Sequence, residues 1–158
     1  YKRQVHMIQS LHPKSITAHM DLYVEVMFSR SELSRAEREM IGTVVSSTNG
    51  CTYCTTHHAE ALNHYWKDPL KVDKLVNKYF DEILTPRERG LCDFAQSLTL
   101  NPGQHENEDL TKNLRALKLS DAAILDAVLV ISYFNFVNRV VLSLGVDLKE
   151  NEFKGYKY

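Results

Sequence analysis

The chain has few of the features that mark specialised protein classes. It contains three cysteines in 158 residues, an odd number that is too small for a disulfide scaffold. Its 19 basic and 20 acidic side chains nearly cancel, and no long run of basic residues provides the positive field that attracts nucleic acid or anionic lipid. With 44% hydrophobic and 25% charged residues, the composition is that of an ordinary soluble globular protein. We therefore expect no nucleic-acid partner.

Long apolar runs are missing as well. The nearest candidate for a membrane span, residues 122–144, is interrupted by four polar or charged residues, so it is interpreted as a buried helix and no membrane partner is expected. If Asn135, Asn138 and Arg139 are buried, they must be hydrogen-bonded, which favours a structural network or a subunit contact over a substrate role. Apolar residues on nearly every side of this helix favour burial in an oligomer. The four polar or charged residues are Asp126, Asn135, Asn138 and Arg139.

The printed residues contain no signal-peptide pattern. A CxxC pair in a protein that is not secreted more often serves redox or metal chemistry than a structural bridge. The expected compartment is therefore the reducing cytoplasm.

Strand-like alternation is also hard to find, and helical periodicity takes its place. Apolar residues recur at steps of three and four within residues 20–27 and 40–45. Helix starts are indicated where a Leu precedes a hydroxyl residue, and two of these starts are capping boxes. We predict an all-α fold of seven or eight helices in one domain, residues 1–158. The starts are LSRAE at 33–37, LTPRE at 84–88 and LSDAA at 119–123, and the predicted ends include Asn49-Gly50, Asp68-Pro69 and Asn101-Pro102-Gly103.

A weak internal repeat is a further prediction. Shifting the chain by 86 positions aligns several residues of 33–62 with residues of 119–148, among them Asn49 with Asn135. The second copy has valines where the first has cysteines, which predicts one reactive site per chain.

The densest group of reactive side chains is the stretch NGCTYCTTHH at residues 49–58, which contains Cys51 and Cys54. Gly50 ends one predicted helix and the next begins within a residue or two, so both thiols are expected in a first helical turn. Unpaired backbone N–H groups and the positive end of the helix dipole favour the thiolate there. Because the cysteines are one turn apart, their side chains share a face and can close a disulfide.

Two further residues can move or orient protons beside these thiols. His58 lies four residues beyond Cys54 on the same helical face, where its imidazole can accept the thiol proton and return it to a leaving alkoxide. Glu39 lies in the preceding helix, and an antiparallel turn at residues 49–50 would bring it near His58 rather than near the cysteines. A carboxylate in that place could orient the imidazole, which gives a relay from Glu39 through His58 to Cys54.

The residues alone leave a redox pair, a metal site and inert cysteines open as interpretations. Zinc could use Cys51, Cys54, His57 and His58, but structural zinc is usually bound by two separated segments, and no second CxxC or HxxxH is present. Redox chemistry is therefore favoured over metal binding. His57 is expected at a surface or interface. Cys92, flanked by apolar positions at helical spacing, is expected to be a buried core thiol.

An acid, a CxxC pair and a histidine in this order resemble the core motif of the AhpD-like alkylhydroperoxidases, within the carboxymuconolactone decarboxylase superfamily. Two other segments, LTPRERGLCDFAQSLT at 84–99 and DAVLVISYFNFVNRVVLSLGV at 126–146, resemble its peroxidase-related members. The resemblance thus extends over most of residues 33–146. The motif consists of Glu39, Cys51, Cys54 and His58, separated by eleven, two and three residues.

This resemblance implies an all-helical fold that assembles into trimers or hexamers, and thiol peroxidase chemistry for which no cofactor or metal is expected. By position, Cys54 would attack the hydroperoxide and become a sulfenic acid, and Cys51 would condense with it to form the disulfide. His58 and Glu39 would form the proton relay, and a lipoyl-bearing or thioredoxin-like dithiol protein would restore the thiols. Decarboxylase members of the superfamily lack the cysteine pair, so decarboxylation is disfavoured.

One position departs from the pattern. The best-studied peroxidase members have a His immediately before the second cysteine, where this chain has Tyr53. The difference bears on peroxidase efficiency and on the choice of reductant rather than on the fold. Two alternatives therefore accompany the peroxidase interpretation: a dithiol-disulfide oxidoreductase acting on a protein partner, and a metal-binding or structural helical module without enzymatic activity.

Overall fold

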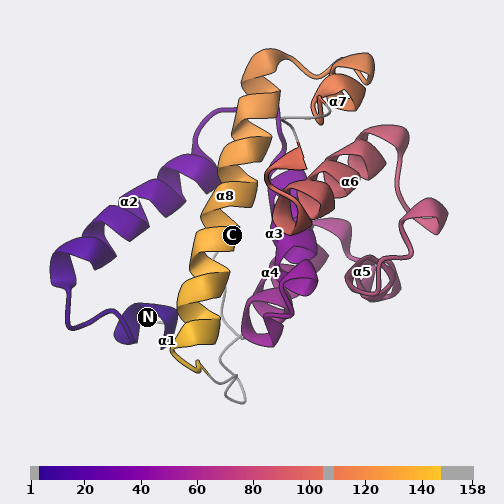
Figure 1. Cartoon of the computed structure of the whole chain (residues 1–158). Helices are drawn as coiled ribbons and strands as arrows, with labels where there is room; N and C mark the ends of the chain where they lie inside the picture. The colour runs from indigo at the N-terminus through magenta and orange to yellow at the C-terminus, as the bar shows by residue number, and fades with distance from the viewer. Residues whose placement is uncertain (1–3, 105–108, 147–158) are drawn as a thin grey trace.

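The computed structural model describes residues 4–104 and 109–146, and over these ranges it consists of α-helices and one 3₁₀ turn, with no strand (Figure 1). The predicted all-α fold is confirmed. The described elements are α1 (Gln4–Met7), α2 (Pro13–Phe28), α3 (Arg35–Thr48), α4 (Thr52–Trp66), α5 (Pro69–Val76), η1 (Phe80–Glu82), α6 (Pro86–Leu100), α7 (Lys112–Ala116) and α8 (Asp121–Ser143).

Side-chain caps define where the long helices begin. Ser34 and Thr85 each accept a hydrogen bond from the backbone N–H three residues further on. Glu37 and Glu88 accept one in return from the N–H of the cap residue, which completes both predicted capping boxes. Ser120 caps α8 through its hydroxyl in the same way. Each cap satisfies a donor that the helix cannot, which stabilises the helix start by about 1 kcal/mol.

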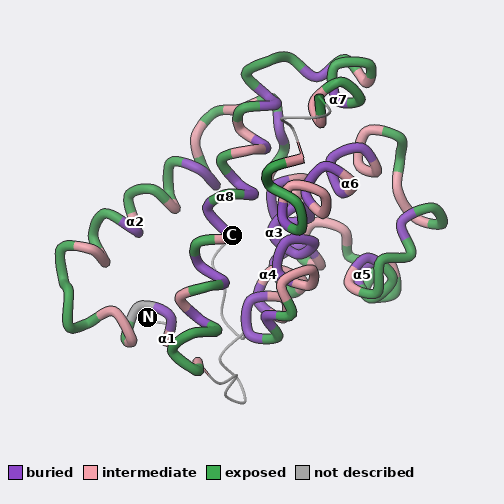
Figure 2. Tube along the Cα trace, viewed as in Figure 1, coloured by how far each residue is buried: buried purple, intermediate pink, exposed green. Residues whose placement is uncertain are grey.

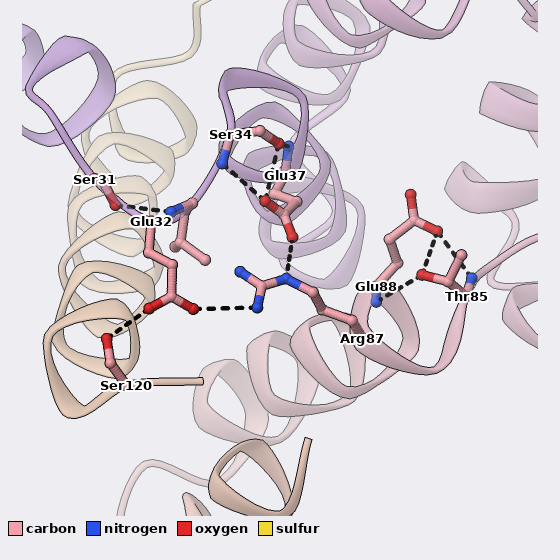
Figure 3. Close-up of polar contacts among 9 residues, drawn as sticks. Ser31, Glu32, Ser34, Glu37, Thr85, Arg87, Glu88 and Ser120 are labelled. Carbon is pink, nitrogen blue, oxygen red and sulfur yellow. Dashed lines mark hydrogen bonds and ion pairs between the residues drawn. The ribbon is translucent and has the colours of Figure 1, made fainter. Parts of the chain in front are cut away.

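The N-terminal ends of α3, α6 and α8 lie together and are connected through one arginine (Figure 3). Arg87, in the first turn of α6, donates to Glu37 at 2.7 Å and to Glu32 at 3.2 Å. Glu32 also accepts a hydrogen bond from the Ser120 hydroxyl at 2.7 Å. The Ser120 hydrogen bond, with a smaller effect of Arg87, holds the pKa of Glu32 below its ordinary value. This polar brace fixes three helix starts relative to one another.

α3 is enclosed on all sides along its middle (Figure 2). Every residue from Arg38 to Ser46 is buried, and the helix packs against α4, α6 and α8. Full burial of a side chain such as Ile41 or Val44 stabilises the fold by about 1.5–3 kcal/mol. Because this stretch has no solvent-facing side, it carries Glu39 into the interior together with its apolar neighbours.

α8 is the long apolar helix predicted over residues 122–144, and it runs between α2 on one side and α6 on the other (Figure 1). In the part of the chain that the structure describes, it is the one helix long and apolar enough to cross a bilayer. Half of that apolar stretch is buried inside the structure. Several large apolar side chains on α2 and α8 nevertheless remain exposed: Leu22, Phe28, Leu125, Leu129 and Phe136.

Candidate active site

The turn between α3 and α4 places both cysteines. Asn49 caps the end of α3, and Gly50 follows with a φ of 69°, in the left-handed region that glycine adopts without strain. The Cys51 N–H then donates to the Ser46 carbonyl at 3.0 Å, which closes the turn. Cys51 is thereby the N-cap of α4, and only Cys54 lies in the first helical turn. The prediction that both thiols lie in that turn was wrong by one residue.

Cys51 and Cys54 form a disulfide, with their Cα atoms 5.3 Å apart, a usual separation for such a bond. The Cys54 N–H, one of the donors that the start of α4 leaves unpaired within the helix, points at the Cys51 sulfur at 3.4 Å. This donor and the helix dipole favour negative charge on the sulfur when the bond is reduced. Cys51 is fully buried and Cys54 is 3% exposed, so the pair is shielded from bulk solvent in the single chain.

Glu39 and His58 meet across the antiparallel pair of α3 and α4, where the sequence predicted their approach. His58 Nδ1 donates to Glu39 Oε2 at 2.8 Å, and Glu39 is 2% exposed. A carboxylate in its ionised form can only accept hydrogen bonds, and with such a partner Nδ1 carries the proton and leaves Nε2 as the acceptor of a neutral ring. His58 lies one turn beyond Cys54 on α4, and imidazole and thiol therefore share a helix face.

Gly42 allows the His58 ring to lie directly against α3. A Cβ atom at this position would come within 2.9 Å of Phe134 Cε2 and 3.3 Å of His58 Cγ. Phe134, from α8, packs edge-on against the imidazole with the ring centroids 4.2 Å apart. The orientation of His58 is thus set by α3, by α8 and by its hydrogen bond to Glu39. No sequence pattern indicated that Phe134 belongs to the site, because it reaches the imidazole through the tertiary packing of α8.

Arg35 also belongs to this site and was missed from the sequence. Its Nη2 donates to Glu39 Oε1 at 2.8 Å, so both oxygens of the buried carboxylate have partners. The pattern that could have revealed it is the four-residue spacing of Arg35 and Glu39, at which opposite charges on a helix pair.

Tyr53 and His57 pack together on the buried side of α4. His57 is 3% exposed within the single chain, so the prediction of a surface or interface position was wrong. Its Nδ1 donates to the Tyr53 carbonyl at 2.7 Å, and the two rings lie 4.2 Å apart. The physical reason is that α4 packs against both α3 and α5, so a side chain a quarter turn from His58 is also covered.

An amide network attaches the cysteine turn to α8. Asn49 Nδ2 donates to Asn135 at 3.1 Å and to Asn138 at 2.9 Å, and Asn138 Nδ2 donates to the Ser46 hydroxyl at 3.3 Å. The predicted structural network is confirmed, and it holds the residues that lead into Cys51. The 86-residue shift of the sequence also aligns Asn49 with Asn135. The internal repeat stays a prediction, and positions 147–148 of its second copy lie outside the described residues.

The other features of interest lie apart from this site. Cys92 is fully buried, and burial raises the pKa of its thiol far above the ordinary value, which confirms a core thiol. Within residues 4–104 and 109–146, no group of three or more His, Cys, Asp or Glu side chains is arranged to hold a metal ion. A cavity of about 630 Å³ opens between α6 and α7, and its lining includes Gly90, Asp93 and Leu114 but none of the motif residues.

Similarity to known proteins identifies the family of this chain. Residues 14–76 match the model of the carboxymuconolactone decarboxylase family. The chain is similar to a peroxidase-related protein from Silicibacter sp. TM1040, whose crystal structure aligns with a TM-score of 0.87 and 31% identity, covering 95% of this chain and 78% of that one. This chain belongs to the carboxymuconolactone decarboxylase superfamily, in its AhpD-like, peroxidase-related group.

Two further proteins are similar to this chain. The crystal structure described as an alkylhydroperoxidase AhpD core, a peroxidase-related protein from Ralstonia eutropha JMP134, has a TM-score of 0.83 and 28% identity, covering 92% of this chain and 76% of that one. The YdfG protein of Bacillus subtilis (strain 168) is 24% identical over 133 residues, which are 84% of this chain and 88% of YdfG. The resemblance predicted from the sequence motif is confirmed at the level of the family.

Proposed function

We propose that this AhpD-like protein is a thiol-dependent peroxidase that reduces hydroperoxides through a Cys51–Cys54 dithiol–disulfide cycle. One observation carries this function: a cysteine pair lies one helical turn from a histidine whose ring is oriented by a buried carboxylate. Support also comes from the two similar structures that are described as peroxidase-related.

In the first half of the cycle, Cys54 is the attacking thiol. Its proton passes to Nε2 of His58, directly or through a water molecule, and the thiolate sulfur attacks the outer oxygen of the hydroperoxide. An S–O bond forms while the O–O bond breaks, and the electron pair leaves on the alkoxide. His58 returns the proton to that alkoxide, which gives an alcohol and a sulfenic acid on Cys54. Glu39 keeps the imidazole oriented in both steps.

In the second half, Cys51 attacks the sulfenic sulfur of Cys54. The S–S bond forms, and the departing hydroxide takes the Cys51 proton and leaves as water. Returning the disulfide to two thiols requires two electrons and two protons. We assign these to a dithiol protein, either lipoyl-bearing or thioredoxin-like, by thiol–disulfide exchange.

We also propose that the protein acts in the cytoplasm as a homo-oligomer, a trimer or a hexamer. The exposed apolar side chains on α2 and α8, such as Phe28, Leu129 and Phe136, give a second copy an apolar surface to cover. Multi-angle light scattering on the purified chain measures the assembly, and a strictly monomeric mass would contradict it.

Intact mass and thiol counting test the cycle. The reduced protein receives one equivalent of tert-butyl hydroperoxide, and we expect the loss of two thiols, mapped to Cys51 and Cys54. Cys51→Ser should stop at a sulfenic acid on Cys54 that a dimedone probe traps, whereas Cys54→Ser should consume no peroxide. Peroxide consumption by Cys54→Ser at the wild-type rate would show that the roles are wrong.

Measurements on the same purified protein distinguish the peroxidase from the two alternative functions. A rate with a protein disulfide far above the rate with the hydroperoxide would identify a dithiol-disulfide oxidoreductase. Stoichiometric zinc by elemental analysis, with no titratable thiols at positions 51 and 54, would identify a metal-binding module instead.

A further inference from the structure

The carboxylate that orients His58 is held between two cationic or potentially cationic partners. Glu39 Oε2 accepts from His58 Nδ1, and Glu39 Oε1 accepts from Arg35 Nη2, each at 2.8 Å. The Glu39 side chain is 3% exposed, whereas that of Arg35 is 22% exposed. The guanidinium therefore lies on the solvent side of a buried carboxylate, and the imidazole lies on the other side.

Arg35 is itself held firmly in this place. Its Nη1 donates to the backbone carbonyl of Met27, at the end of α2, at 2.6 Å. Its guanidinium carbon lies 3.9 Å from the centroid of the Phe28 ring, a stacking that suits a planar cation. Held by a carbonyl, a ring and a carboxylate, the group needs no rearrangement to pair with Glu39.

The charge of Arg35 decides which hydrogen-bonding role Glu39 can take. A buried carboxylate without a counter-charge tends to bind a proton, because its ionised form loses the solvation of water. A neutral carboxyl group can then donate to His58 Nδ1 instead of accepting from it. Whether the added proton sits on the carboxyl group or on the more basic imidazole, Nε2 then carries a hydrogen and the ring loses its acceptor for the thiol proton.

We propose that Arg35 is a positioning residue that keeps Glu39 in its acceptor role and thereby fixes His58 in the Nδ1–H tautomer, with Nε2 as the base. This role rests on the proposed peroxidase function for its purpose, but the tautomer itself is a property of the resting protein. Arg35 touches neither the thiols nor the substrate in this arrangement, and it acts through Glu39.

The direct test is the ¹⁵N NMR pattern of the His58 ring in the histidine-labelled protein at about pH 8, above the ordinary titration range of imidazole. Comparison with His58→Gln assigns the signals. We expect the Nδ1–H pattern in the wild type and a shift toward a pattern with a hydrogen on Nε2 in Arg35→Met. Arg35→Lys, which retains the charge, should restore the Nδ1–H pattern. An unchanged Nδ1–H pattern in Arg35→Met would overturn the proposal.

Arg38 provides a matched control. It is 3% exposed, and it donates to the carbonyls of Val26 and Ser29 at the end of α2, but it makes no hydrogen bond to Glu39 among the described contacts. Arg38→Met therefore removes a buried arginine from the same helix junction without touching the carboxylate. It should leave the His58 tautomer as in the wild type. A tautomer shift of equal size in this variant would show that Arg35→Met acts through the junction and not through Glu39.

The rate of thiol oxidation gives a second test of the role of Arg35. Arg35→Met should slow the oxidation of the thiols by tert-butyl hydroperoxide by about 10-fold or more, a part of the 10²–10⁴-fold that general acid–base catalysis commonly contributes. In a Glu39→Gln background it should add no further loss, because the group through which Arg35 acts is gone. Full additivity of the two losses would contradict the proposal. If Arg35→Met does not fold, Arg35→Gln provides the same removal of charge with retained polarity.

Failure of the peroxidase function would be recognised separately. A wild-type protein that oxidises no thiols with hydroperoxide would contradict the proposed activity. The NMR comparison of Arg35→Met with Arg35→Lys would still decide whether Arg35 sets the tautomer.

Discussion

Replacing Gly42 with alanine adds one methyl group at the closest contact of α3 with the His58 ring. The new Cβ atom would lie 2.9 Å from Phe134 Cε2, 3.1 Å from its Cδ2 and 3.3 Å from His58 Cγ. Ordinary carbon–carbon contacts begin at about 3.5 Å. The Phe134 ring must therefore retreat by about 0.6 Å, and the imidazole that it packs against must move with it or lose the contact.

Two opposing terms set the stability of Gly42→Ala. Alanine in the middle of a helix is more favourable than glycine by about 1 kcal/mol. Overpacking a tight core costs about 1–3 kcal/mol. We expect the variant to be less stable by about 0–2 kcal/mol, which lowers the melting temperature by at most about 8 °C for a domain of this size.

The activity should fall as well, because the imidazole is displaced from its position. A misplacement of 1 Å at a reacting group can cost about 100-fold in rate, so a shift of roughly half that size in His58 should cost about 10-fold. Single-turnover oxidation of the thiols by tert-butyl hydroperoxide measures this rate, and thermal unfolding measures the stability.

Gly90→Ala is the matched control for this variant. A Cβ at position 90 would collide with Leu117 Cδ1, at a helix contact remote from the motif. The contact is with the end of a flexible, partly exposed leucine side chain, so the stability should change little, and the oxidation rate should stay at the wild-type value. Wild-type kinetics in Gly42→Ala would refute the placement of His58 against α3 as a requirement of the chemistry.

Three further residues lead to specific predictions. Arg87→Leu removes the ion pairs to Glu32 and Glu37. Because these pairs are partly exposed, the substitution should lower the free energy of unfolding in urea by about 1 kcal/mol, and by less at high salt. An unchanged unfolding midpoint would contradict the brace between helix starts. Asn138→Leu leaves buried polar partners unmatched and should cost about 1–3 kcal/mol, whereas a neutral result would show that water replaces the amide. Cys92 should resist iodoacetamide in the native protein and react in urea, as peptide mass mapping can show, because burial raises the pKa of its thiol; rapid native alkylation would exclude a core position.

The parts of the fold that the sequence predicted well depend on local chemistry. A capping box such as that of Ser34 and Glu37 is decided within four residues, so its spacing alone locates the helix start. The approach of Glu39 to His58 could be predicted because one short turn at residues 49–50 reverses the chain, and the two side chains lie at nearly equal distances from it. Local rules and one reversal were therefore sufficient for this pair.

The parts that the sequence did not predict depend on which elements pack against the pair. Helical periodicity places His57 a quarter turn from His58, but it cannot show that α5 covers that side of α4. Phe134 lies 76 residues after His58 in the sequence, and only the packing of α8 across α3 and α4 brings their rings together. Contacts of this kind follow from the tertiary arrangement, which periodicity does not contain.

The chemistry of the site is a better explanation of its buried charges than stability is. Burying Glu39 beside His58 and Arg35 removes these groups from water, and buried charge networks can often be replaced by apolar residues of similar volume at little or no loss of stability. A core that needed only to be filled at this point of α3 would be served by leucine or methionine, as Met40 and Ile41 serve the next two positions. Instead, both oxygens of the Glu39 carboxylate accept hydrogen bonds, one from a ring and one from a guanidinium, in the helix pair that carries Cys54. For the peroxidase function proposed above, such a network contributes little to folding and much to holding a base beside a thiol.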